Sequence, residues 1–70
     1  MKDKFIFFSG KIINTKEILY LEQIYDVTER KKYKIYCYLK GGYTFREEFN
    51  TFQEQTERYR ELFEDLKENS

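Results

Sequence analysis

Tyrosines and cations at alternate positions give this chain its clearest means of recognising another molecule. Tyr36 and Tyr38 alternate with apolar residues in one segment, Arg46 lies in the next segment and Tyr20 in an earlier one. Rings and cations on an exposed sheet hold single-stranded nucleic acid by stacking on bases and contacting phosphates. Tyrosine and arginine are also the usual anchors of protein interfaces, and tyrosine is common in half-exposed strands for packing alone. The predicted partner-binding residues are Tyr20, Lys34, Tyr36, Tyr38 and Arg46.

The distribution of charge favours a protein over a nucleic acid as the partner. The formal net charge is zero; residues 1–50 hold ten basic and seven acidic side chains, and residues 51–70 hold three basic and six acidic ones. Arg30, Lys31 and Lys32 form a secondary basic tip, but so few cations attract phosphate only weakly. A nucleic-acid-binding domain normally carries a strong basic footprint. We therefore expect a protein partner, with weak binding of single-stranded nucleic acid through the sheet face of Tyr36, Tyr38 and Arg46 as the alternative.

The residue types that usually carry catalysis or metal binding are absent or badly placed. The sequence has no histidine and a single cysteine, Cys37. A nucleophilic thiol then has no histidine base, and a closed zinc site lacks its ligands. Glu47 and Glu48 would point to opposite faces of a strand, and Gly41-Gly42 joins two strands instead of opening a helix as a phosphate loop does. We expect no enzymatic activity, no cofactor and no metal site.

The segment from Lys34 to Glu48 predicts the hairpin that would position these residues. Apolar and polar residues alternate on both sides of the glycine pair, as in strands with one buried face. A two-residue turn would set Arg46 opposite Cys37 on the apolar face, whereas a three-residue loop over 40–42 sets Phe45 there, so we expect the longer loop. The predicted cross-strand pairs are Leu39 with Tyr43, Cys37 with Phe45, Ile35 with Glu47, Tyr36 with Arg46 and Lys34 with Glu48.

Three further strands precede this hairpin. Phe5–Phe8 and Lys11–Asn14 flank a Ser9-Gly10 turn signal. Ile18–Val27 predicts a longer strand, and because neither of its faces is cleanly polar we expect a central position or a bulge. The register of this strand stays open.

One helix follows the hairpin. Thr51 and Glu54 have the spacing of a capping box at a helix start. Tyr59, Leu62 and Phe63 lie on its apolar stripe and are expected to be its most buried residues.

Together these elements predict a single α+β domain over residues 1–70. It has a four- or five-stranded antiparallel sheet over about residues 4–49, with one C-terminal helix over about residues 51–67 packed on one face. One helix covers only part of such a sheet, so the other face stays exposed. A chain this short buries only about 60% of its unfolded surface, and it usually needs a disulfide, a metal or a partner chain. A lone cysteine excludes an intrachain disulfide, so we expect a homodimer.

The N-terminal sequence has neither the apolar run of a signal peptide nor the length of a membrane span. One unpaired cysteine fits a reducing compartment. We expect a cytoplasmic protein without membrane contact.

Two resemblances bear on function. Ile18–Glu22 (Ile-Leu-Tyr-Leu-Glu) resembles the Ile-Leu-Tyr-Ile-Glu phrase early in LytTR-type DNA-binding domains, which also continue with a hairpin and a tail helix. No counterpart of that family's DNA-contacting loop residues is found, so no residue is carried over. In size and in lacking a chemical site, the chain resembles accessory proteins of phages and mobile elements, some of which inhibit host defences. The predicted function is a small, self-associating protein-interaction module that inhibits or adapts a host protein.

Overall fold

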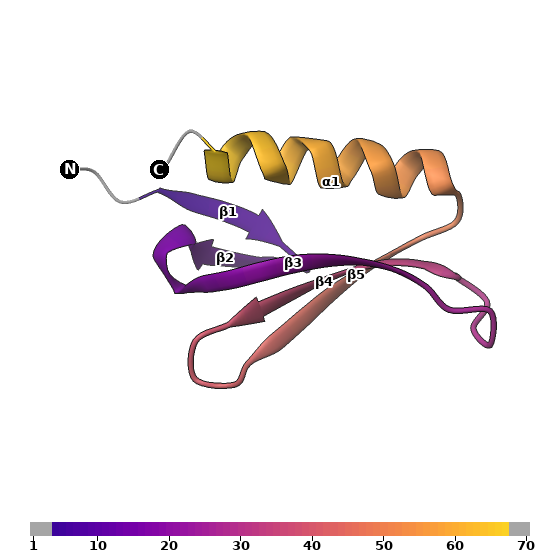
Figure 1. The fold of residues 1–70 in the computed structure, drawn as a ribbon, viewed down its shortest axis with the longest axis horizontal. Helices are drawn as coiled ribbons and strands as arrows, with labels where there is room; N and C mark the ends of the chain where they lie inside the picture. The colour runs from indigo at the N-terminus through magenta and orange to yellow at the C-terminus, as the bar shows by residue number, and fades with distance from the viewer. Residues whose placement is uncertain (1–3, 68–70) are drawn as a thin grey trace.

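The computed structural model describes residues 4–67, which form five strands, one short 3-10 helix and one α-helix. Residues 1–3 and 68–70 of the predicted 1–70 domain lie outside the described residues. The elements in chain order are β1 (Phe5–Phe8), β2 (Lys11–Asn14), η1 (Thr15–Glu17), β3 (Ile18–Tyr25), β4 (Tyr33–Leu39), β5 (Thr44–Phe49) and α1 (Phe52–Lys67). The predicted α+β class is confirmed (Figure 1).

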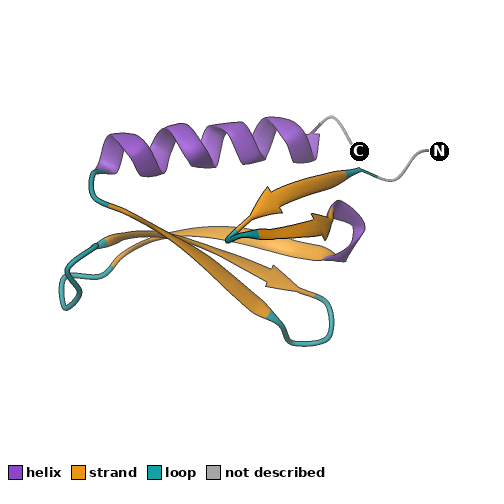
Figure 2. Cartoon of the chain, turned by 180° about the vertical axis from the view of Figure 1, so that it is seen from behind, coloured by secondary structure: helices purple, strands orange, loops and turns teal. Residues whose placement is uncertain are grey.

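The five strands form two antiparallel sheets, so the prediction of one four- or five-stranded sheet is wrong in that detail. β1 pairs only with β2, and the main sheet has the order β3-β4-β5. Ser9 and Gly10, both at positive φ (53° and 75°), fold β1 directly back onto β2. The resulting hairpin packs on the face of the main sheet beside α1 instead of extending its edge (Figures 1 and 2). Apolar strand segments in a sequence do not distinguish a hairpin that packs on the face of a sheet from one that extends its edge.

β3 is an edge strand with a bulge at Leu19. Ile18 lies opposite Leu39, but Tyr20 lies opposite Tyr38, so one extra residue stands on β3. The bulge lets Ile18 and Leu21, three residues apart, both pack against the core. This irregularity explains why neither face of the segment is cleanly polar; the bulge alternative is confirmed and the central position is wrong, because β4 is central.

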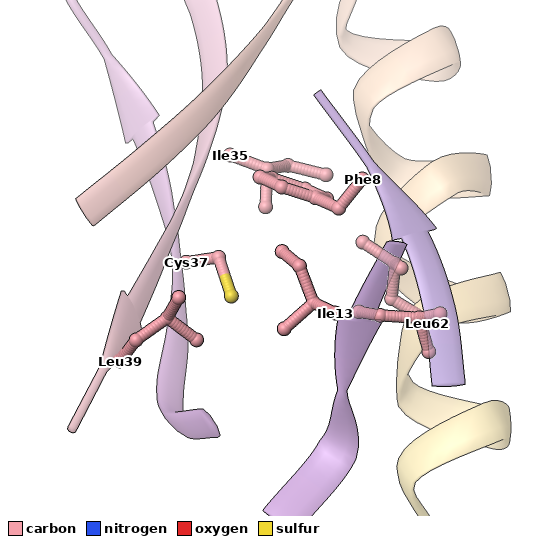
Figure 3. Close-up of a cluster of buried hydrophobic side chains, with 7 residues drawn as sticks. Phe8, Ile13, Ile35, Cys37, Leu39 and Leu62 are labelled. Atoms are coloured by element: carbon pink, nitrogen blue, oxygen red, sulfur yellow. The ribbon is translucent and has the colours of Figure 1, made fainter. Parts of the chain in front are cut away.

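The core lies between the main sheet and the layer made by the β1–β2 hairpin and α1. Phe8 and Ile13 from the hairpin and Leu62 from α1 point toward Ile35 and Cys37 of β4 (Figure 3). Phe8, Ile35, Cys37 and Leu62 are fully buried. Each of the two sheets and the helix therefore contributes side chains that water does not reach.

The predicted β4–β5 hairpin is confirmed residue by residue. Cys37 lies opposite Phe45, and the backbone N–H of Leu39 donates to the carbonyl of Tyr43 at 2.8 Å, which closes a loop over 40–42. Gly41 and Gly42 both have φ of 87°, a conformation that is strained for other residues. The alternation of apolar and polar residues and the glycine turn were sufficient to predict this register, because both act within one short segment.

The helix begins as predicted but presents a narrower face to the core. Thr51 Oγ1 accepts from the N–H of Glu54 at 3.1 Å, and Glu54 Oε1 accepts from the N–H of Thr51 at 3.2 Å, which confirms the capping box. Leu62 is buried as expected, but Tyr59 is only half-buried and Phe63 is 50% exposed, so the prediction is wrong for both aromatic residues. The β1–β2 hairpin occupies part of the sheet face beside α1, so the helix shares that face with it (Figures 1 and 2).

Gln55 takes the buried place on α1 that an aromatic residue was expected to fill. It is 3% exposed, and its Nε2 donates to the carbonyls of Ile24 (3.1 Å) and Lys34 (2.7 Å). These bonds satisfy a buried amide and fix the first turns of α1 over β3 and β4.

Candidate functional site

The face of the main sheet turned away from α1 and the β1–β2 hairpin is the candidate site. In the register of the three strands, one residue from each strand forms a row across this face. We call this surface the open face; its rows are Tyr20-Tyr38-Thr44, Glu22-Tyr36-Arg46 and Ile24-Lys34-Glu48. All five residues predicted to bind a partner therefore lie together on one face.

Three tyrosines on the open face are held in a fixed arrangement. The rings of Tyr20 and Tyr38 are stacked, with centroids 4.4 Å apart and an interplanar angle of 24°. Tyr36 is tilted against Tyr38 at 6.2 Å. The hydroxyl of Tyr38 donates to Glu22 Oε1 at 2.8 Å. This hydrogen bond to a carboxylate, with smaller contributions from burial and nearby charge, raises the pKa of Tyr38 to about 12, so the phenol stays a neutral donor at physiological pH.

Lys34 does not offer a free cation on this face. Its side chain is 1% exposed, and its Nζ lies 3.0 Å from Glu29, 3.4 Å from Glu48 and 4.0 Å from Asp26. The hydrogen bond to Glu29 is the largest cause that raises the pKa of Lys34, and it outweighs the opposing effect of burial. The ammonium is thus enclosed by carboxylates, and its position is structural.

Arg46 is the accessible cation of the open face. Its side chain is 57% exposed, with a long contact of 3.9 Å from Nε to Glu48. A hollow of about 410 Å³ opens beside it, lined by Ser9, Tyr36, Thr44, Phe45 and Arg46. A ring, a cation and a concave surface therefore meet near the β5 edge.

The secondary basic tip lies in the loop between β3 and β4. Arg30, Lys31 and Lys32 are all exposed there. The same loop supplies Asp26 and Glu29 to Lys34, so its cations are interspersed with carboxylates. Asp26 Oδ1 also accepts from the hydroxyl (2.6 Å) and the N–H (3.0 Å) of Thr28, and these two bonds lower the pKa of Asp26.

The roles of three acidic residues on this surface escaped prediction. The bond between Tyr38 and Glu22 was not predicted, because the bulge at Leu19 left the register of β3 open. Asp26 and Glu29, which enclose Lys34, lie in a loop whose path no periodicity specifies. The charged run at 26–32 was the available signal of these ion pairs. A lysine in the middle of an aromatic strand needs carboxylate partners when it is buried, and this run contains the nearest carboxylates before it in the sequence.

The cysteine of the chain, Cys37, lies apart from the open face. Cys37 is buried in the core, and burial raises its pKa to about 11, so its thiol is protonated at neutral pH. Among residues 4–67 there is no group of three or more His, Cys, Asp or Glu side chains that could hold a metal ion. In the same part of the chain, no helix is long and apolar enough to cross a membrane.

Comparison of the chain with protein-family models, with curated proteins and with solved structures finds no match. The resemblance of Ile18–Glu22 to LytTR-type domains therefore rests on that phrase alone.

Proposed function

We propose that this chain is a small, non-enzymatic protein-binding module whose contact surface is the open face. The observation that carries the proposal is the fixed set of Tyr20, Tyr36 and Tyr38 beside the exposed Arg46. Tyrosine and arginine dominate the binding energy of protein interfaces. Side chains already held in place lose less conformational entropy on binding, and the hydrogen bond to Glu22 supplies that restraint here.

The charges on the open face favour a partner of complementary charge. Glu22 is exposed near one edge, and Arg46 is exposed near the other. A partner surface with an apolar centre, a cation opposite Glu22 and a carboxylate opposite Arg46 would complement both. The small size and composition of the chain favour an accessory protein of a phage or mobile element that inhibits or adapts a host protein.

Binding of single-stranded nucleic acid is the second candidate, supported by the stacked tyrosines. Base stacking on aromatic side chains is worth about 1–3 kcal/mol per base. The enclosure of Lys34 weighs against it, because that ammonium already neutralises nearby carboxylates. Glu22 and Glu48 also lie on the face and would repel phosphates.

Two experiments distinguish these functions. Fluorescence anisotropy with labelled DNA and RNA oligonucleotides at about 0.15 M salt is expected to give no binding tighter than about micromolar, since two or three stacked bases supply little more. Affinity capture with the wild-type chain as bait, compared with Tyr36→Ala/Tyr38→Ala, is expected to recover a protein that the double variant loses. Nanomolar oligonucleotide binding that the double variant abolishes would instead establish the nucleic-acid function.

A further inference from the structure

The exposed edge of β3 differs from the protected edge of β5. β5 carries Arg46, Glu47 and Glu48, and Glu47 Oε2 accepts from the N–H of Ser9 at 3.0 Å, so the β1–β2 turn lies against it. Charges and covering loops are the usual protection of sheet edges. β3 has one charged residue, Glu22, and five of its eight residues are exposed. Within residues 4–67, β3 pairs with β4 alone.

The hydrogen-bonding groups on this edge follow from the β3–β4 register. The N–H of Asp26 donates to the carbonyl of Lys32 at 2.7 Å, in the same register that sets Tyr25 opposite Tyr33. In antiparallel pairs, hydrogen-bonded and non-bonded residues alternate. The backbone groups of even-numbered residues from Tyr20 to Ile24 therefore point to β4. Those of Leu21, Gln23 and Tyr25 point outward along the edge.

An apolar groove adjoins the same edge. A cavity of about 340 Å³ lies between β3 and the C-terminal half of α1, lined by Leu21, Tyr59, Phe63, Leu66 and Lys67. Phe63 is 50% exposed beside it, and Tyr25, on the same face of β3 as Leu21, is 56% exposed. An edge strand with outward backbone groups beside an apolar groove is the arrangement that binds an added strand.

We propose that two copies of this chain pair through antiparallel β3 strands, about a two-fold axis at Gln23, to form a continuous six-stranded sheet. Facing residues must point to the same side of the sheet, so odd-numbered residues of one copy face odd-numbered residues of the other. One residue of β3 therefore faces its own counterpart across the two-fold axis. An axis at Glu22 would set two carboxylates opposite each other, which is destabilising. An axis at Leu21 would bring the bulge at Leu19 into both ends of the pairing.

The Gln23 register uses every outward-pointing group of the regular part of β3. Gln23 faces Gln23 of the second copy, and Leu21 faces its Tyr25, in three bonded pairs that exchange two backbone hydrogen bonds each. The tyrosine of the second copy is then directed to the mouth of the groove beside Leu21 and Phe63, where it would cover apolar surface that the monomer exposes. The two amide side chains can donate to and accept from each other.

This pairing would join the open faces of the two copies across the axis, with Glu22 of one copy beside Ile24 of the other. It does not depend on the proposed partner contact, because the edge and groove lie apart from Tyr36 and Arg46. A small chain without a disulfide gains from such pairing, since oligomerisation is one of the usual supplements to a small core.

Cysteine cross-linking tests the register. Facing residues in a bonded pair have Cα atoms about 5.5 Å apart, within disulfide range, whereas pairs beyond about 7 Å are not bridged. Under mild oxidation, Gln23→Cys is expected to give a covalent dimer. Leu21→Cys and Glu22→Cys, the matched controls for the axes at Leu21 and Glu22, are expected to stay monomeric on a non-reducing gel, as is the wild-type chain, whose Cys37 is buried. Cross-linking of a control in place of Gln23→Cys, or of none, overturns the proposal.

Mass in solution tests the association itself. Sedimentation equilibrium is expected to give about twice 8.8 kDa for the wild type and for Gln23→Thr. Gln23→Lys sets two ammonium groups opposite each other at an exposed position, and it is expected to raise the dimer dissociation constant about tenfold or more, with an unchanged circular dichroism spectrum. A wild-type monomer at several hundred micromolar would overturn the proposal and leave the β3 edge to a strand from a different protein. Equal masses for Gln23→Lys and Gln23→Thr would also overturn it.

Discussion

Arg58 and Glu47 form a two-pronged ion pair that joins α1 to β5. The Nε of Arg58 lies 2.8 Å from Glu47 Oε1, and its Nη2 lies 3.2 Å from Oε2. Arg58 also donates to the carbonyl of Phe7 in β1 and to Glu61, while Glu47 accepts from the N–H of Ser9. The helix, the main sheet and the β1–β2 hairpin are thus held at one point, where the two side chains are only 20% and 18% exposed.

Removing this arginine is expected to destabilise the fold. Arg58→Ala leaves the carboxylate of Glu47 and the carbonyl of Phe7 without their donor, and hydrogen bonds to charged groups are worth about 1.5–3 kcal/mol. Arg58→Lys should recover only part of the loss, because an ammonium does not make the paired contact. Urea denaturation measures the effect, with Arg60→Ala on the exposed side of α1 as the control. Equal stabilities of the two alanine variants would show that the ion pair contributes nothing.

Two neighbouring apolar residues of α1 are expected to differ sharply in their contribution to stability. Leu62 is fully buried, and Leu62→Ala should lower the free energy of unfolding by about 2–4 kcal/mol. Phe63 is 50% exposed, so Phe63→Ala should cost less than about 1 kcal/mol. Thermal unfolding followed by circular dichroism compares them. A larger loss for Phe63→Ala would mean that the helix packs with a different face.

Alkaline pH is expected to weaken the fold through Tyr38. Its folded pKa of about 12 lies above the ordinary tyrosine value of 10.0, so its interaction stabilises the folded state fully below about pH 10 and is lost as pH rises toward 12. Urea unfolding measured between these pH values should show the decline, and Tyr38→Phe should remove this contribution. Tyr43→Phe, in the exposed loop, is the control. An identical alkaline decline in Tyr38→Phe and the wild type would contradict the assignment.

The sequence specified local structure well and long-range packing poorly. The β4–β5 register and the capping box at Thr51 were predicted because each depends on residues a few positions apart. The separate β1–β2 sheet was not predicted, since a short apolar segment such as Phe5–Phe8 fits a strand of a larger sheet and a separate packed hairpin equally well. The five candidate site residues do lie on one face, but the burial of Lys34 depends on Asp26 and Glu29 in a loop, which no local pattern specifies.

Isothermal titration of the captured protein against matched variants measures whether the open face is a protein-contact surface. Arg46→Glu changes an exposed side chain and leaves the packing intact, and Arg60→Glu is its control on α1. Interface anchors of this type cost about 2 kcal/mol or more when removed, roughly 30-fold in affinity. We predict that Arg46→Glu and Tyr36→Ala/Tyr38→Ala each weaken binding by at least that factor and that Arg60→Glu leaves it within about threefold. Unchanged affinity of both open-face variants, with their fold intact by circular dichroism, would contradict the claim.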